Sequence, residues 1–321
     1  EVRLQHFRRA TADIGANGDN DTLPFDVDVR FINERQEALA DLADTYCQEL
    51  NSLNKKKVKD TINSLEVFSE RLLVPTGAAG FRITTKIHPF WNIYLNGLGI
   101  AIAEAHEPLR SDRAHSYRYA QQGDRLFDRA SSWRAFREAC IADCEAKGDG
   151  IVVVQTDISS FYEHVYHHRI ENCIDDLFPD GSKVATQVDR FLSKLAAGRS
   201  FGLPVGGQCS RILAELVLSA VDRRLTDAEI EWRRYVDDFV LVTTSQAGAY
   251  RALAILSHAL ADYGLTLNRT KTTILTGKHF CDYVRTQLGD TGDSATKLRE
   301  IDLHFDPYSD TCVEDYEELK E

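Results

Sequence analysis

The sequence contains no methionine, although a chain of 321 residues would ordinarily carry several. No run of about eighteen apolar residues occurs, so no transmembrane helix is expected. No signal peptide is visible either. These absences predict a cytoplasmic protein without a membrane partner.

Disulfides and chain dividers are also missing. The seven cysteines are an odd number and include no CxxC pair, which favours reduced thiols over a disulfide framework or a zinc site. No internal repeat and no low-complexity linker divides the chain. With 43% apolar residues, the chain can bury a sizeable core.

Positive charge is scarce. The formal net charge of −12 is unfavourable for a nucleic-acid enzyme, because phosphate binding draws on a positive surface. Residues 300–321 account for much of it, with nine acidic residues and one lysine. Residues 110–137 instead hold seven arginines against three aspartates, a local excess of positive charge of the kind that contacts phosphate groups. An ordinary solvated helix surface is the alternative for each of these arginines.

Three carboxylates stand at the ends of expected strands. RYVDDFVLVTT, residues 234–244, places Asp237 and Asp238 between two apolar runs and predicts a β-hairpin with acid at its tip. GIVVVQTD, residues 150–157, reads as a buried strand that ends in Asp157. Such carboxylates can converge on two metal ions about 4 Å apart, as in phosphoryl transfer. A solvated turn is the alternative for the Asp-Asp pair alone.

Two further segments accompany these carboxylates. GLPVGG, residues 202–207, predicts a loop whose backbone can approach a flat ligand, followed by a helix with Ser210 near its start. After the hairpin, residues 249–263 predict a helix stopped by Gly264, and LTLNRTKTTIL follows.

In this order the segments resemble the palm of the reverse transcriptases, over about residues 150–276. Asp157 matches the first motif, GLPVGGQCS the second, YVDD the third and GLTLNRTKT the fourth. HSYRYAQQGDRLFDRASSWRAF, residues 115–136, resembles the fingers signature of bacterial abortive-infection and defence-associated members. The implied fold is α+β: a right-hand polymerase palm and fingers, with helices packed on one face of an antiparallel sheet and a helical N-terminal region.

The resemblance implies an RNA-directed DNA polymerase of antiphage defence that uses dNTPs and an RNA template and makes DNA. Asp157 and Asp237 would ligate two Mg²⁺ ions, or Mn²⁺, with the carbonyl of Ile158 as a backbone ligand and Asp238 in support. Lys271 would protonate or neutralise the departing pyrophosphate.

The resemblance also implies the contacts to the nucleotide. Tyr162 would block a ribose 2′-hydroxyl, and Arg118 would grip the triphosphate with its planar guanidinium. The other expected contacts are Arg82, Lys86, Val205, Gly206 and Ser210. Val205 departs from the glutamine of the retroviral pattern, and Arg211 departs from its proline.

Other functions fit the same residues. The palm could make untemplated or protein-primed DNA, or be an idle scaffold that binds RNA. Clustered carboxylates favour catalysis over a scaffold. Partners left open are a structured non-coding RNA, a second copy of the chain and an accessory protein.

The expected organisation is a helical region at 1–74, fingers at 75–149, a palm at 150–285 with a fingers-side insertion near 170–200, and an acidic segment at 286–321. Within it we expect a helix over 31–50, another reaching Leu72, and a strand at FRITTKI followed by a helix. Residues 277–289 are expected to form a pair of strands.

Overall fold

The computed structural model describes residues 1–18, 22, 26–76, 80–123, 125–128, 130–148, 150–178 and 182–289. They form two compact units. The helical unit comprises residues 1–109, 119–126 and 162–217, and the sheet unit comprises residues 110–118, 127–161 and those from 218 onward. The expected acidic segment lies, from residue 290, outside the described residues. The division into four regions stays a prediction.

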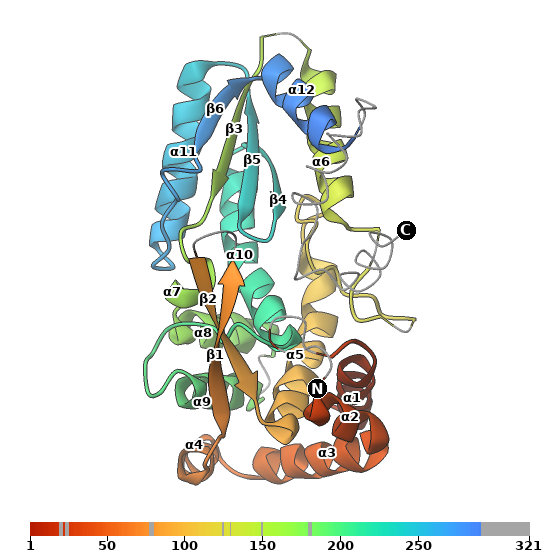
Figure 1. Cartoon of the computed structure of the whole chain (residues 1–321). Helices are drawn as coiled ribbons and strands as arrows, with labels where there is room; N and C mark the ends of the chain where they lie inside the picture. Colours follow the sequence, from red (N-terminus) through yellow and green to blue (C-terminus); the bar gives the residue numbers. More distant parts are fainter. Residues whose placement is uncertain are drawn as a thin grey trace. The chain divides into compact units, whose positions relative to one another are not determined.

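The helical unit consists of helices and one β-hairpin (Figure 1). Its elements are α1 (Leu4–Asn17), α2 (Val27–Glu34), α3 (Gln36–Ser52), α4 (Lys55–Ser64), β1 (Ser69–Thr76), β2 (Gly80–Ile87), α5 (Pro89–His106), the 3₁₀ turn η1 (Glu107–Leu109), α8 (His167–Leu177) and α9 (Val184–Leu195). Two helices, α7 (Phe161–His164) and α10 (Gln208–Asp227), carry residues of both units.

Helix α5 is the centre of the helical unit. Pro89 occupies its first turn, where the missing N–H costs nothing, and most of its later residues are buried. Gly97 allows α1 to pack closely, since a Cβ atom there would overlap the ring of Phe7. Near the start of α10, the Cys209 N–H donates to Oδ1 of Asn96 at 2.8 Å. Asn96 in turn donates to Oδ1 of Asn92 at 3.0 Å, so α5 anchors this end of α10.

The sheet unit is built on four antiparallel strands in the order β4-β5-β3-β6. Its elements are α6 (Trp133–Lys147), β3 (Val152–Asp157), β4 (Glu231–Tyr235), β5 (Asp238–Thr243), α11 (Gln246–Ala261), β6 (Thr273–Thr276) and α12 (Gly277–Gln287). Strand β3 lies between β5 and β6, and this central position fixes the end of β3 that carries Asp157.

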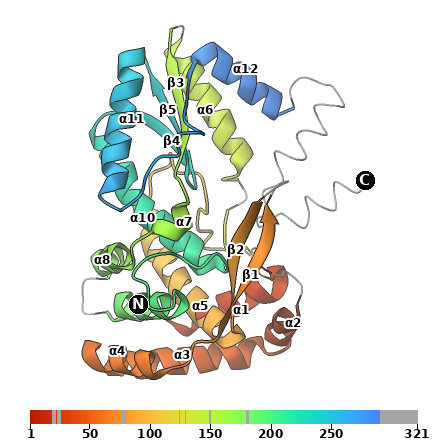
Figure 2. The ribbon, with the colours of Figure 1, turned by 60° about the vertical axis from the view of Figure 1, so that its left-hand side comes forward.

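Helices cover both faces of this sheet. Val153, Val240 and Val242 share one face by strand alternation, and they form a buried cluster with residues of α6 and α12. Phe239 and Leu241 point the other way and are fully buried. Helix α11 contacts β3 and β5 and lies across the sheet from α6 and α12 (Figure 2).

The α+β class and the antiparallel sheet are confirmed, although helices were expected on one face only. The hairpin at YVDD, the strand at FRITTKI and the helix after it are confirmed as well. The helix expected over 31–50 is two helices, α2 and α3.

Two expected elements are wrong. The helix expected to reach Leu72 ends at Ser64, because residues 69–76 pair with β2 in a register that sets Leu73 opposite Ile83. Residues 277–287 form α12 and not strands, because Phe280, Cys281 and Val284 recur at helical spacing and bury one face against α6. No helix in the described ranges is both long and apolar enough to cross a membrane.

The close approach of α1 and α5 gives a test of the packing. Gly97→Ala should lower the free energy of unfolding by about 1–2 kcal/mol, because overpacking against Phe7 outweighs the gain in helix propensity. Chemical denaturation measures this. Phe7→Leu vacates space at the ring, so the double variant should lose less than the sum of the single variants. Additive losses would show that the ring contact is not the cause.

Candidate active site

The three carboxylates come together at one end of the sheet. Strands β3 and β5 pair so that Asp157 stands directly opposite Asp238. Tyr235 pairs with Asp238, and the two-residue turn between them carries Asp237. Like charges placed directly opposite on neighbouring strands destabilise a sheet. The arrangement therefore concentrates negative charge at the expense of stability.

The local environment shifts the proton equilibrium of this group. Asp157 is buried, and Asp237 and Asp238 are partly buried. Burial, followed by the charges of Asp157 and Asp238 and a hydrogen bond with Asp157, raises the pKa of Asp237 well above its usual value. The cluster thus binds a proton readily when no cation neutralises it.

A cation of the chain already reaches the cluster. Nζ of Lys271 lies 2.6 Å from Oδ2 of Asp157, although the lysine side chain is 66% exposed. The hydrogen bond to Asp157 raises the pKa of Lys271. Asn268 organises the turn that precedes Lys271. Its N–H donates to the Asp157 carbonyl at 2.7 Å, and its Oδ1 accepts from the Thr270 N–H.

The donor set fits a hard divalent cation. Ile158 forms an antiparallel bridge with Leu267, flanked by hydrogen bonds from the Ser159 N–H to the Thr266 carbonyl and from the Asn268 N–H to the Asp157 carbonyl. Ile158 and Leu267 are therefore a non-hydrogen-bonded pair. In such a pair the carbonyl of Ile158 points away from Leu267, towards the side on which β5 lies. It is available there beside the carboxylates.

Among the described residues, no three or more His, Cys, Asp or Glu side chains form a metal site by themselves. Mg²⁺ does not need one, because it commonly binds one or two carboxylates together with water and substrate phosphates. Asp157, Asp237 and the Ile158 carbonyl could hold such an ion.

Several expected nucleotide contacts lie in the helical unit. The Leu203 N–H donates to the carbonyl of Tyr162 at 2.7 Å, and the Thr85 N–H donates to the carbonyl of Val205 at 2.7 Å. Tyr162, the loop at 202–207 and β2 are thus held together. Gly207, the residue after Gly206, has φ +75°, a conformation that suits glycine. A Cβ atom at Gly207 would press on Asn92. Ser210 is buried in α10.

Two of the expected triphosphate contacts, Lys86 and Arg118, are already engaged within their own units. Lys86 forms ion pairs with Asp26 at 2.5 Å and Asp28 at 2.8 Å, and hydrogen bonds to these carboxylates raise the pKa of Lys86. Arg82 shares the face of β2 that carries Lys86. Nη1 of Arg118, in the sheet unit, donates to the Ser111 carbonyl at 2.7 Å. Binding of a triphosphate would have to compete with these bonds.

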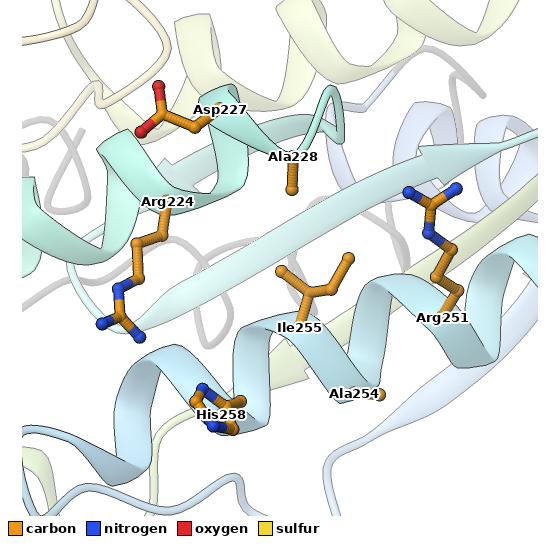
Figure 3. Close-up of a pocket in the computed structure, with 7 residues that line it drawn as sticks. All are labelled: Arg224, Asp227, Ala228, Arg251, Ala254, Ile255 and His258. Atoms are coloured by element: carbon orange, nitrogen blue, oxygen red, sulfur yellow. The ribbon is translucent and has the colours of Figure 1, made fainter.

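The sheet unit also has a surface groove of about 600 Å³ between α10 and α11 (Figure 3). Arginine, histidine and aspartate side chains line it together with small apolar ones: Arg224, Asp227, Ala228, Arg251, Ala254, Ile255 and His258. It contains none of the three clustered carboxylates and is not the candidate site.

The sequence matches a known family over residues of both units. The family model described as reverse transcriptase (RNA-dependent DNA polymerase) matches residues 105–289, more than half of the chain. The chain belongs to this family. Membership implies dependence on a divalent metal ion in general.

The similarity to an individual protein covers a smaller part of the chain. The chain is 35% identical to the telomerase reverse transcriptase of Rattus norvegicus over 77 residues, which cover 23% of the chain and 7% of that protein.

Two solved structures share a partial likeness. Apo telomerase from Candida tropicalis has a TM-score of 0.49 at 12% identity, covering 67% of this chain and 46% of that one. Telomerase from Candida albicans, in complex with a fragment of telomeric RNA, has a TM-score of 0.48 at 14% identity, covering 67% and 43%. Neither likeness bears on the activity of this chain.

The residues that hold the hairpin in place were not predicted from the sequence. Arg234 is 0% exposed and forms an ion pair with the buried Asp222 of α10. A signal was present: Arg234 follows Trp232 by two residues and so shares its buried face of β4, where a cation needs a partner. Asp222 likewise lies next to the buried Val221 in the apolar stripe of α10.

The raised pKa of Asp237 makes a prediction about stability. A carboxyl group whose pKa rises on folding stabilises the native state below its unfolded pKa, and that contribution is lost as the pH rises through the folded pKa. Asp237→Asn should therefore raise the melting temperature at pH 8 in EDTA by about 2–4 °C. The difference should vanish near pH 3. A lower melting temperature for this variant at pH 8 would contradict the assignment.

Proposed function

We propose that this chain is an RNA-directed DNA polymerase that uses two Mg²⁺ ions to add dNTPs to a primer hydroxyl. The observation that carries the proposal is the approach of Asp157 and Asp237 at the ends of paired strands, beside Lys271, in a chain of the reverse transcriptase family. A group this rich in like charge is costly for folding and is typical of catalytic sites.

The side chains have separate tasks in this proposal. Asp157 and Asp237 bind the metal ions together with the Ile158 carbonyl, and Asp238 adds negative charge from the opposite strand. Bound Mg²⁺ would supply activation of the primer hydroxyl and neutralisation of the triphosphate. Lys271 would leave Asp157 and either protonate the departing pyrophosphate or neutralise its negative charge electrostatically. The hydrogen bond to Asp157 raises the pKa of Lys271 and keeps it charged until that contact is released.

The remaining expected residues would bind the nucleotide. Tyr162 selects deoxyribose, and the backbone of Val205 and Gly206, with Ser210 behind it, supports the base and the sugar. Arg82, Lys86 and Arg118 would contact phosphate after release from their present partners. Guanidinium and ammonium groups are suited to phosphate, and this is the support for their assignment.

Partners and biological setting are part of the proposal. RNA is the expected template, and a non-coding RNA, a second copy or an accessory protein could complete the assembly. The resemblance of residues 115–136 to defence-associated enzymes supports a role against phages. None of the six cysteines in the described part of the chain forms a disulfide, which suits a cytoplasmic location.

The proposed polymerase activity predicts an effect of the carboxylates on catalysis. Purified protein should incorporate labelled dTTP on poly(rA) primed with oligo(dT) in the presence of Mg²⁺. Asp157→Asn and Asp237→Asn should each reduce the rate by about 10²–10³-fold, because each removes charge from the metal site. Asp282→Asn, at an exposed carboxylate of α12, is the matched control and should retain the wild-type rate.

The outcomes separate the alternative functions. Product that ignores added RNA, or stays attached to protein, would favour untemplated or protein-primed synthesis. If the protein makes no product but still binds RNA, the result would favour the idle RNA-binding scaffold.

A second prediction concerns sugar selection. Tyr162→Ala should reduce discrimination against rNTPs by about 10- to 100-fold in kcat/KM, because the bulk that meets the 2′-hydroxyl is removed. Tyr162→Phe keeps that bulk and should discriminate as the wild type does. Equal discrimination by all three proteins would exclude Tyr162 as the selecting residue.

A further inference from the structure

Asp237 sits next to a strained residue. Val236 precedes it in the two-residue turn and has φ +51°. A β-branched residue rarely adopts this left-handed conformation, and strained residues persist only where their surroundings hold them. The strained residue immediately precedes Asp237, one of the two carboxylates proposed to bind metal.

Both backbone polar groups of Val236 are bound by buried side chains. Its N–H donates to Oγ of Ser116 at 2.8 Å, and its carbonyl accepts from Nη1 of Arg234 at 2.9 Å. Ser116 and Arg234 are both 0% exposed. The turn is therefore held from the segment at 110–118 and from β4 at once.

Arg234 is itself fixed by a second partner. Its Nε and Nη2 donate to the two carboxylate oxygens of Asp222, at 2.9 and 2.7 Å. Its own N–H and carbonyl bond to Arg113 and His115, which joins β4 to the segment that carries Ser116. A planar guanidinium can make such a bidentate bond and still reach a third acceptor, which an ammonium cannot.

We propose that Ser116, Arg234 and Asp222 form a clamp that holds Val236 in its strained conformation and thereby aims the carboxylate of Asp237 at Asp157. They are positioning residues, since none of them belongs to the proposed metal ligands. The inference rests on the proposed function, because it assigns the clamp to the metal-binding geometry of that site. A buried ion pair adds little net stability compared with apolar packing, so precise geometry is the better reason for its presence.

The test uses Ser116→Ala, which removes one anchor without leaving a buried charge. Ser245→Ala is the matched control: it also deletes a bonded hydroxyl of the sheet unit, the cap of α11, beyond the other end of β5. Arg234→Lys is the second variant. It keeps the positive charge but lacks the planar guanidinium that makes the bidentate bond to Asp222. Two quantities are measured for each protein: kcat and KM for dTTP on poly(rA)/oligo(dT), and the rise in melting temperature caused by Mn²⁺ over EDTA.

We expect Ser116→Ala to lower kcat by about tenfold or more while KM for dTTP changes by less than about twofold, because a displaced Asp237 impairs the chemical step more than binding. The Mn²⁺-dependent rise in melting temperature should shrink, although the melting temperature in EDTA stays close to that of Ser245→Ala. Arg234→Lys should show the same split with a larger loss of kcat.

The clamp is overturned if Ser116→Ala matches Ser245→Ala in kcat and in the Mn²⁺-dependent rise while the wild type is active. Wild-type protein without polymerase activity and without any Mn²⁺-dependent rise overturns the proposed function, and this inference with it.

Discussion

Repulsion among Asp157, Asp237 and Asp238 is the constraint on which the sheet unit depends. Strand pairing sets Asp157 opposite Asp238, and the turn adds Asp237 beside them. Packing alone does not favour this arrangement, because each ionised carboxylate raises the free energy needed to ionise the next one. Lys271 neutralises part of this charge, and in the proposed function a divalent cation would neutralise the rest.

The structure around this cluster is held by packing and by buried hydrogen bonds. Strand β3 is central in the sheet, and the cluster of α6 and α12 residues fixes one face of it. The turn before Asp238 is anchored through Arg234 and Ser116. In the helical unit, α5 similarly fixes the loop at 202–207 and the start of α10 through Asn92 and Asn96. In both units a polar buried side chain sets the path of a loop.

Much of this organisation was legible in local sequence. Strand β3 and the hairpin follow from apolar runs that end in acid, and α11 follows from its helical spacing. Elements whose pattern was ambiguous were less predictable. Residues 65–72 carry apolar side chains at helical spacing, yet those from 69 onward pair with β2, because long-range pairing outweighs local preference. Residues 277–287 were expected as strands although their buried side chains recur at helical spacing.

The sequence by itself determined the family, the antiparallel sheet and the identity of the clustered carboxylates, because these depend on residue type and short spacings. Only the tertiary structure decided which distant groups meet. It joined Asp222 to Arg234 and Ser116 to Val236, and it bound Lys86 to Asp26 and Asp28. Such contacts depend on strand register and on the approach of segments far apart in the chain, and no local pattern encodes them.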